Sequence, residues 1–231
     1  MKKFVFIVAI ALALSACTCN FSSGSVKVGN GKRVFCKGPV VERSFDLSGF
    51  DAITINGHAD IDIYQGTDWS VRVVANEKVF DYLNYHVDGS ELVLETLNNV
   101  NLVADEYDIY ITVPVLTGIT VNGAADLDLK RGYSADKDLS VVVNGAGDLE
   151  ISSIEVPSLS VELKGAGDMD LEFIKVGRLI IDVKGAGDVE VSGKADWASF
   201  SVSGAGAIDA TRLDCPQVEK NRAGVAVIRT K

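Results

Sequence analysis

Histidine is almost absent from this 231-residue chain, which contains two, and its 22 Lys and Arg are outnumbered by 32 Asp and Glu. So few imidazoles argue against a histidine-rich metal site or a histidine-based catalytic triad. The formal net charge of -10 argues against nucleic acid as a partner, because nucleic-acid binding needs a basic surface. The spacing of the four cysteines fits no zinc site. Beyond the N-terminus, no apolar run has the length of about 20 residues that a membrane-spanning helix needs.

The N-terminus has the pattern of an export signal. Lys2 and Lys3 precede an uncharged apolar run over residues 4–14, and small residues follow before Cys17. The segment Leu-Ser-Ala-Cys (14–17) resembles the bacterial lipobox, and this resemblance implies cleavage before Cys17 and acylation of its thiol. An ordinary secreted protein with a chance cysteine at this position is the alternative. The sequence therefore predicts an exported, outer-membrane-anchored lipoprotein, and it does not decide between the periplasmic and the surface side.

The chain divides into four predicted regions. Residues 1–16 form the lipoprotein signal peptide, and 17–39 form a lipidated tether rich in Ser, Gly and Asn near its start. Residues 40–118 form an N-terminal β part with longer coils, and 119–231 contain regular β repeats. Removal of Lys2 and Lys3 with the signal changes the formal charge from -10 to -12. An exported compartment permits disulfides, but the pairing of the three remaining cysteines does not follow from the sequence; they are Cys19, Cys36 and Cys215.

A repeated corner dominates the second half of the chain. It first occurs as Ile-Asn-Gly-His-Ala-Asp-Ile-Asp-Ile (55–63), and five further copies follow. The later copies begin at Val121, Val143, Leu163, Val183 and Val202. The first glycines of these five copies recur at a nearly constant interval; they are Gly123, Gly145, Gly165, Gly185 and Gly204. A nearly fixed period of about 20 residues is typical of repeat architectures.

The repeats alternate with a period of two. Leu159, Val161 and Leu163 lie on one predicted strand face, and Ser160 and Glu162 lie on the other. One unit cannot bury its apolar face alone, whereas stacked units bury a continuous core. The sequence therefore predicts an all-β fold, a parallel β-helix with coils of about 20 residues in which equivalent residues form columns. An antiparallel β-sandwich is the alternative, because it also has evenly spaced strands.

The long segment between Gly57 and Gly123 interrupts this pattern. We expect a short helix over residues 77–83 and a hairpin at Asp88-Gly89, followed by a strand over residues 107–113. This segment forms either longer coils with an inserted helix and hairpin or a separate small β-subdomain.

A resemblance to a known family rests on these same residues. The segment Val-Pro-Val-Leu-Thr-Gly-Ile-Thr-Val-Asn-Gly (113–123) and the Gly-Ala-Gly-Asp copies after it resemble the head GIN domain family of auto-transporter adhesins, found among lipoproteins of Bacteroidetes. The resemblance covers residues 40 to 231. It implies a right-handed β-helical fold and an adhesion role, and it carries no catalytic residues.

Two columns of acidic residues are the clearest chemical feature. The first column holds Asp60, Asp126, Asp148, Asp168 and Asp188, and the second holds Asp62, Asp128, Glu150, Asp170, Glu190 and Asp209. Carboxylates about 5 Å apart repel by roughly 0.8 kcal/mol in water and by about 3 kcal/mol at a dielectric constant of 20. Turn amides that donate to the corner aspartates, interleaved lysines such as Lys164 and Lys184, or cations between the coils would each offset this repulsion. Calcium is thus a candidate ligand of Asp126, Asp148, Asp168 and Asp188, and no other cofactor is expected.

The remaining candidates are residues outside the repeat. His58, Trp69 and Trp197 are candidate binding residues, since the two indoles could stack on sugars. Because a catalytic site is a unique break in a pattern and the carboxylates recur, we expect a non-catalytic binding, adhesion or structural module. A carbohydrate-active enzyme or carbohydrate-binding protein of the envelope is the alternative. The expected partners are a membrane through the lipid, a glycan or cationic envelope component, and a second copy through open strand edges.

Overall fold

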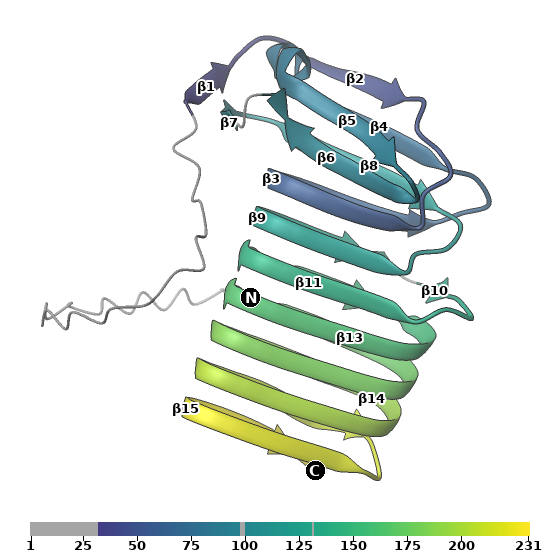
Figure 1. The fold of residues 1–231 in the computed structure, drawn as a ribbon, viewed down its shortest axis with the longest axis vertical. Helices are drawn as coiled ribbons and strands as arrows, with labels where there is room; N and C mark the ends of the chain where they lie inside the picture. Colours follow the sequence, from purple (N-terminus) through teal and green to yellow (C-terminus); the bar gives the residue numbers. More distant parts are fainter. Residues whose placement is uncertain (1–31, 98–99, 131) are drawn as a thin grey trace, which may run out of the picture. The chain divides into compact units, whose positions relative to one another are not determined.

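The computed structural model of the protein describes residues 32–97, 100–130 and 132–231. The predicted signal peptide, Cys17 and Cys19 lie outside these residues. The described part is almost wholly β-structure (Figure 1). Its first elements are β1 (Arg33–Cys36), β2 (Val40–Phe45), β3 (Ala52–Gln65), β4 (Ser70–Asn76), the 3-10 helix η1 (Glu77–Tyr82), β5 (Leu83–Asp88), β6 (Glu91–Thr96), β7 (Asn101–Ala104) and β8 (Tyr107–Val113). They are followed by β9 (Gly118–Leu129), β10 (Tyr133–Ser134), β11 (Leu139–Ala146), β12 (Leu149–Ser152), β13 (Ile154–Ala166), β14 (Met169–Asp214) and β15 (Val218–Thr230).

The repeat copies lie over one another in parallel register. Gly145 of β11 pairs with Gly165 of β13, which pairs with Gly185 of β14. The apolar side chains that alternate along these strands point inward, and Leu163 and Val183 are fully buried. The register that the repeat predicts is therefore confirmed for these copies. Burial of the alternating apolar face explains it, because a slip of one residue would turn every buried side chain outward.

The predicted right-handed parallel β-helix is nevertheless wrong as a description of the whole fold, because the sheet is mixed. β4 runs antiparallel to both β2 and β8, and β5 runs antiparallel to β6. These strands belong to the same 13-stranded sheet as the parallel repeats. The physical reason lies in the segment between Gly57 and Gly123, which has no repeat corner. A two-residue turn at Gly89 and Ser90, directly after Asp88, reverses the chain and closes the predicted hairpin between β5 and β6.

The short helix predicted over residues 77–83 does not form as an α-helix. The segment Glu77–Tyr82 makes only a 3-10 helix, and its N-cap residue Asn76 makes no side-chain capping hydrogen bond. So short a segment does not repay α-helix nucleation without such support. The Asn76 side chain instead donates to the Gly38 carbonyl oxygen at 3.0 Å and accepts from the Asp105 amide at 2.8 Å, so it connects neighbouring segments.

The last strand of the stack differs from the others at its core-facing positions. Lys220 and Arg222 of β15 pair with Phe200 and Val202 of β14, both of which are buried. Lys220 donates through Nζ to Thr230 Oγ1 at 2.6 Å. Charged side chains at positions that are apolar in earlier copies are typical of edge strands that resist further strand pairing. This end of the stack therefore disfavours association through its open edge, whereas self-association as such stays a prediction.

Two further features concern helices and cysteines. No helix in the described part of the chain is long and apolar enough to cross a membrane. Among the same residues the free thiols are Cys36, which is buried, and Cys215, which is partly exposed. These two cysteines therefore do not form a disulfide with each other.

Candidate functional site

The two acidic columns form one face of the stacked repeats. Asp128 of β9, Glu150 of β12 and Asp170 of β14 pair in parallel register and make the centre of the second column. Asp60 and Asp62 of β3 pair with Asp126 and Asp128 and extend both columns by one copy. The intervening residues Ile61, Leu127 and Leu149 point inward and are buried. The period-two alternation of each strand therefore sets the carboxylates side by side at strand spacing, about 4.8 Å.

Backbone amides stabilise the first column. Asp126 Oδ1 accepts a hydrogen bond from the amide of Asp148 at 3.1 Å, and Asp148 Oδ1 accepts one from the amide of Asp168 at 3.0 Å. The ladder continues along the column: the amide of Asp188 donates to Asp168 Oδ1 at 3.3 Å, and the amide of Ala207 donates to Asp188 Oδ1 at 3.0 Å. These bonds are the turn-amide compensation that the sequence suggests for the corner aspartates. Each aspartate in the ladder thus uses one oxygen to tie one copy to the next.

Basic side chains neutralise one end of the second column. Lys130 Nζ lies 3.0 Å from Asp62 Oδ1 and also forms an ion pair with Asp128. Burial lowers the pKa of Lys130, but hydrogen bonds to these two carboxylates and their negative charge outweigh burial, so the pKa is raised overall. Lys130 lies two residues after Asp128 and therefore on the same strand face. This spacing in the sequence is a signal for the ion pair, but the repeat pattern does not reveal it.

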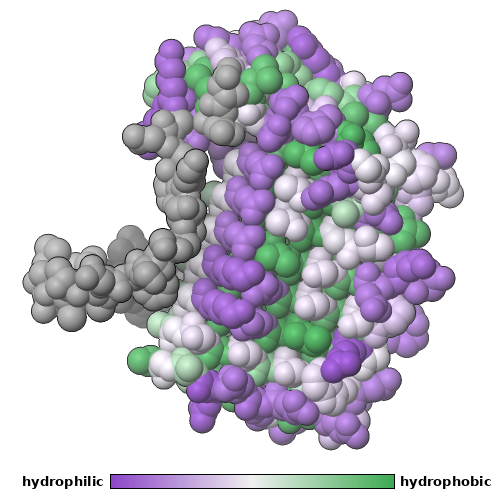
Figure 2. Space-filling view, viewed as in Figure 1, coloured by the Kyte–Doolittle hydropathy of each residue, from purple (hydrophilic) through white to green (hydrophobic). Residues whose placement is uncertain are grey.

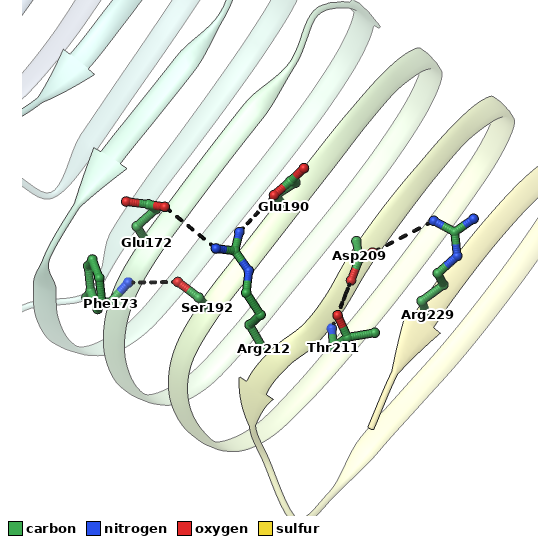
Figure 3. A network of polar contacts seen from close by, with 8 residues as sticks. All are labelled: Glu172, Phe173, Glu190, Ser192, Asp209, Thr211, Arg212 and Arg229. Carbon is green, nitrogen blue, oxygen red and sulfur yellow. Dashed lines mark hydrogen bonds and ion pairs between the residues drawn. The ribbon is translucent and has the colours of Figure 1, made fainter. Parts of the chain in front are cut away.

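Arginines neutralise the other end (Figure 3). Arg212 lies between Glu190, 2.8 Å away, and Glu172, 3.8 Å away. Asp209 lies 3.8 Å from Arg229 and accepts hydrogen bonds from the hydroxyl and amide of Thr211. These contacts with Thr211 come first among the causes that lower the pKa of Asp209. Both ends of the column therefore have cationic partners.

The centre of the two columns forms an acidic groove. Its volume is about 470 Å³, and both columns contribute carboxylates to its walls, with Ile61, Leu127 and Leu149 among the lining residues. We define the acidic groove by the carboxylates Asp60, Asp62, Asp126, Asp128, Asp148, Glu150, Asp168 and Asp170. Burial raises the pKa of Asp170, and the charges of Glu190 and Glu150 raise it further. The carboxylates of the groove therefore repel one another, and this repulsion adds to the effect of burial on the pKa of Asp170.

Lys164 and Lys184 do not interleave with the acidic columns. Lys164 pairs with Glu162 at 2.8 Å, and Lys184 pairs with Glu162 at 2.7 Å and with Asp182 at 2.7 Å. Hydrogen bonds from both lysines lower the pKa of Glu162. The suggestion that these lysines offset the acidic columns is wrong, because their partners precede the corner and the columns follow it.

In earlier copies asparagines occupy the position of these lysines. Asn122 donates to Asn56 Oδ1 at 3.0 Å, and Asn144 donates to Asn122 Oδ1 at 2.9 Å. Figure 2 shows hydrophilic residues gathered in a band that crosses the stacked strands. The recurrence of Asn-Gly in three corners was a signal for this ladder, since stacked amides pair along a column.

A second, smaller cavity adjoins the groove at Asp60. It has a volume of about 290 Å³ and is lined by His58, Asp60 and residues 104–108. His58 is exposed and meets the Tyr107 ring edge-on, with 6.2 Å between ring centroids. Burial raises the pKa of Asp60, and the charges of Asp126 and Asp108 raise it further. The imidazole therefore lies in acidic surroundings beside the first column.

The two tryptophans have partners within the protein. Trp69 is 40 % exposed and donates through Nε1 to the Phe50 carbonyl oxygen at 2.7 Å. Arg178 lies 4.4 Å from the centroid of the Trp197 ring. His58, Trp69 and Trp197 therefore contact different residues, and these contacts do not bring the three side chains together in one binding site.

Metal binding gains no support from the column geometry. Across residues 32–97, 100–130 and 132–231, no group of three or more His, Cys, Asp or Glu side chains is arranged to hold a metal ion. The amide ladder already uses one oxygen of Asp126, Asp148, Asp168 and Asp188. The lipid-attachment residue Cys17 lies outside the described residues.

The fold and the groove define the protein as a repeat-built, all-β domain with an acidic face. A family model described as "Putative auto-transporter adhesin, head GIN domain" matches residues 49–230, and the chain belongs to this family. The resemblance in the repeat corners is thereby confirmed. Membership of this adhesin family indicates an extracellular or envelope location and is consistent with an adhesion or binding role.

Solved structures support the fold. A "Putative lipid binding protein" from Parabacteroides distasonis ATCC 8503 is 20% identical with a TM-score of 0.76, and the match covers 87% of this chain and 100% of that one. A "putative adhesin" from the same organism is 17% identical with a TM-score of 0.73, covering 86% and 84%. Another from Bacteroides fragilis NCTC 9343 is 15% identical with a TM-score of 0.63, covering 86% and 100%. A comparison with curated protein sequences finds no match.

Proposed function

We propose that this protein is a lipid-anchored, non-catalytic adhesion module of the bacterial envelope, and that its acidic groove binds a cationic partner. The anchor rests on the lipobox resemblance of Leu-Ser-Ala-Cys (14–17), which follows a charged start and a short apolar run. The binding role rests on membership of an adhesin family. The single observation that carries the cationic partner is the acidic groove, in which Glu150 and Asp170 form no ion pair with another described residue, whereas Lys130 and Arg212 form ion pairs at its two ends.

The arrangement of the carboxylates argues for binding rather than catalysis. A hydrolase that uses two carboxyl groups needs one acid and one base in different surroundings. Here Asp128, Glu150 and Asp170 occupy the same backbone register on successive copies, so the strand geometry singles out no acid–base pair. A repeated set of equal charges suits a long partner that makes the same contact several times.

Electrostatics gives the expected chemistry of the partner. A cationic group about 4 Å from one carboxylate gains about 1 kcal/mol in water and about 4 kcal/mol at a dielectric constant of 20. Several such contacts along the groove would add up for a Lys- or Arg-rich segment of an envelope protein. Because the groove is open to solvent, the attraction decreases as salt screens it.

Fluorescence anisotropy with a labelled oligolysine peptide tests this proposal. We expect binding at low salt that weakens at least tenfold when Glu150→Gln and Asp170→Asn are combined. The matched control combines Asp136→Asn and Asp138→Asn, which remove the same charge from an exposed loop. Equal loss of affinity in both double variants would show that only net charge matters and would overturn the groove. A glycan array with the same protein tests the carbohydrate alternative.

A further inference from the structure

Charge is distributed unevenly along the mature chain. From Cys17 to Val41 there are four basic residues and no acidic one, and the first acid is Glu42. The basic residues are Lys27, Lys32, Arg33 and Lys37. The formal charge of the mature chain is -10 - 2 = -12, so residues 42–231 carry -12 - 4 = -16. The segment that links the proposed lipid anchor to the domain is therefore positively charged, whereas the rest of the protein is negatively charged.

The first strand of the domain exposes an aromatic ring. β1 pairs with β7 in parallel, and Phe35 lies opposite Val103. The side chains that face inward are buried, with Cys36 and Leu102 at 0% and 2% exposure. Phe35 is 62% exposed and Val103 is 40% exposed. This two-stranded sheet thus presents a small apolar face to the outside, while Cys36 and Leu102 on its other face join the core.

Basic side chains flank this apolar face. Lys32, Arg33 and Lys37 are all exposed. Arg33 lies two residues before Phe35 on β1, so the two side chains are on the same, outward face of the strand. Figure 1 shows β1 and β7 at the end of the stack away from β15. An aromatic residue surrounded by lysine and arginine is the composition of surfaces that lie on anionic bilayers, where the ring enters the headgroup region and the cations meet phosphates.

We propose that the outward face of β1 and β7 docks on anionic lipid headgroups of the membrane that holds the acyl chains of Cys17. This inference rests on the proposed lipid anchor. Only the short segment 18–31 separates Cys17 from Lys32, so the anchor keeps β1 close to the bilayer surface. Phe35 and Val103 enter the interface, and Lys32, Arg33 and Lys37 contact lipid phosphates. Docking would hold this end of the domain against the membrane. The carboxylates of the acidic groove would then remain accessible to soluble or surface partners.

Depth-dependent fluorescence quenching tests the docking face. The acylated chain carrying Phe35→Trp is reconstituted into vesicles of phosphatidylcholine and phosphatidylglycerol, with and without brominated acyl chains. The matched control is Val225→Trp, because Val225 is 85% exposed on β15. After subtraction of the wild-type signal from Trp69 and Trp197, we expect bromine to quench the tryptophan at 35 at least twice as strongly as the one at 225. Combined Lys32→Gln, Arg33→Gln and Lys37→Gln should halve this difference.

The outcomes separate the docking face from the anchor. Equal quenching at residues 35 and 225 in acylated protein overturns the docking face and leaves the anchor intact. A blue shift of the tryptophan at 35 that grows with protein concentration and needs no vesicles assigns the face to a second copy and also overturns it. An intact mass without acyl groups on Cys17 overturns the anchor itself.

Discussion

Substitution of Gly165 by alanine should destabilise the protein because the repeat corners lie directly over one another. Gly165 has φ +153°, and a Cβ added there would lie 1.8 Å from the carbonyl oxygen of Gly145. Contacts of this length do not occur, so the two copies would have to separate. A side chain in this backbone region costs about 1–3 kcal/mol, and overpacking adds about 1–3 kcal/mol. Gly165→Ala should therefore lower the free energy of unfolding by about 2–6 kcal/mol.

Gly57→Ala is the matched control. Gly57 has nearly the same backbone conformation, with φ +141°, but a Cβ there meets nothing within 4 Å. It should incur only the conformational cost, about 1–3 kcal/mol. Urea unfolding followed by circular dichroism measures both variants, and comparable m values would show that the same surface is exposed. If Gly165→Ala is no more destabilising than Gly57→Ala, the corners do not stack as described and the reasoning fails.

Three further substitutions test the core and the acidic columns. Leu163→Ala removes a fully buried side chain and should lower the unfolding free energy by about 2–5 kcal/mol in thermal denaturation; a loss under about 1 kcal/mol would contradict the continuous core. Asp170→Asn should stabilise the protein at pH 7 by roughly a few tenths of a kcal/mol, because burial and the charges of Glu190 and Glu150 raise the pKa of this carboxyl in the folded state and solvent screening keeps the effect small. This gain should disappear as the pH falls through that pKa, and a pH-independent effect would refute it. Lys130→Gln should destabilise the protein by about 1 kcal/mol at low salt by leaving Asp62 and Asp128 without their cation, and by less at high salt, which screens the ion pair; equal losses at the two salt concentrations would contradict the ion pair.

The stacked repeats were predictable because each corner has the same shape. Gly145, Gly165 and Gly185 recur at one spacing, and the alternating apolar residues fix the register on either side. Once the corners stack, columns of aspartates and asparagines follow from the sequence alone. The acidic groove could therefore be anticipated from Asp and Glu at equivalent positions, which the repeat alignment places on one face.

The antiparallel strands were not predictable from the repeat. Between Gly57 and Gly123 the chain has no second corner, so nothing in the sequence pattern fixes which strand pairs with which. A parallel β-helix that continues through this segment is wrong, because β4 pairs antiparallel with β2 and β8. Strand pairing over long separations depends on the packed core as a whole, and local alternation does not encode its direction.

The neutralised ends of the second column also escaped the repeat analysis. Lys130 lies at a repeat position where the later copies have Ser152, Glu172, Ser192 and Thr211, so its role does not follow from what recurs. Arg212 forms ion pairs with Glu190 and Glu172, which belong to two earlier copies (Figure 3). These contacts depend on how the copies stack and do not follow from the sequence pattern. Lys164 and Lys184 recur at one position of the repeat, but their partners Glu162 and Asp182 lie two residues earlier on the same strands, before the corner.

Carbodiimide cross-linking of an oligolysine peptide to the protein, mapped by mass spectrometry, tests the proposed role of the acidic groove most directly. This reagent joins a lysine amine to a carboxylate only where the two are in contact. We expect cross-links concentrated at Asp148, Glu150, Asp168 and Asp170, and their loss in high salt. Cross-links spread over the acidic residues in proportion to their exposure, with no preference for these four, would contradict it.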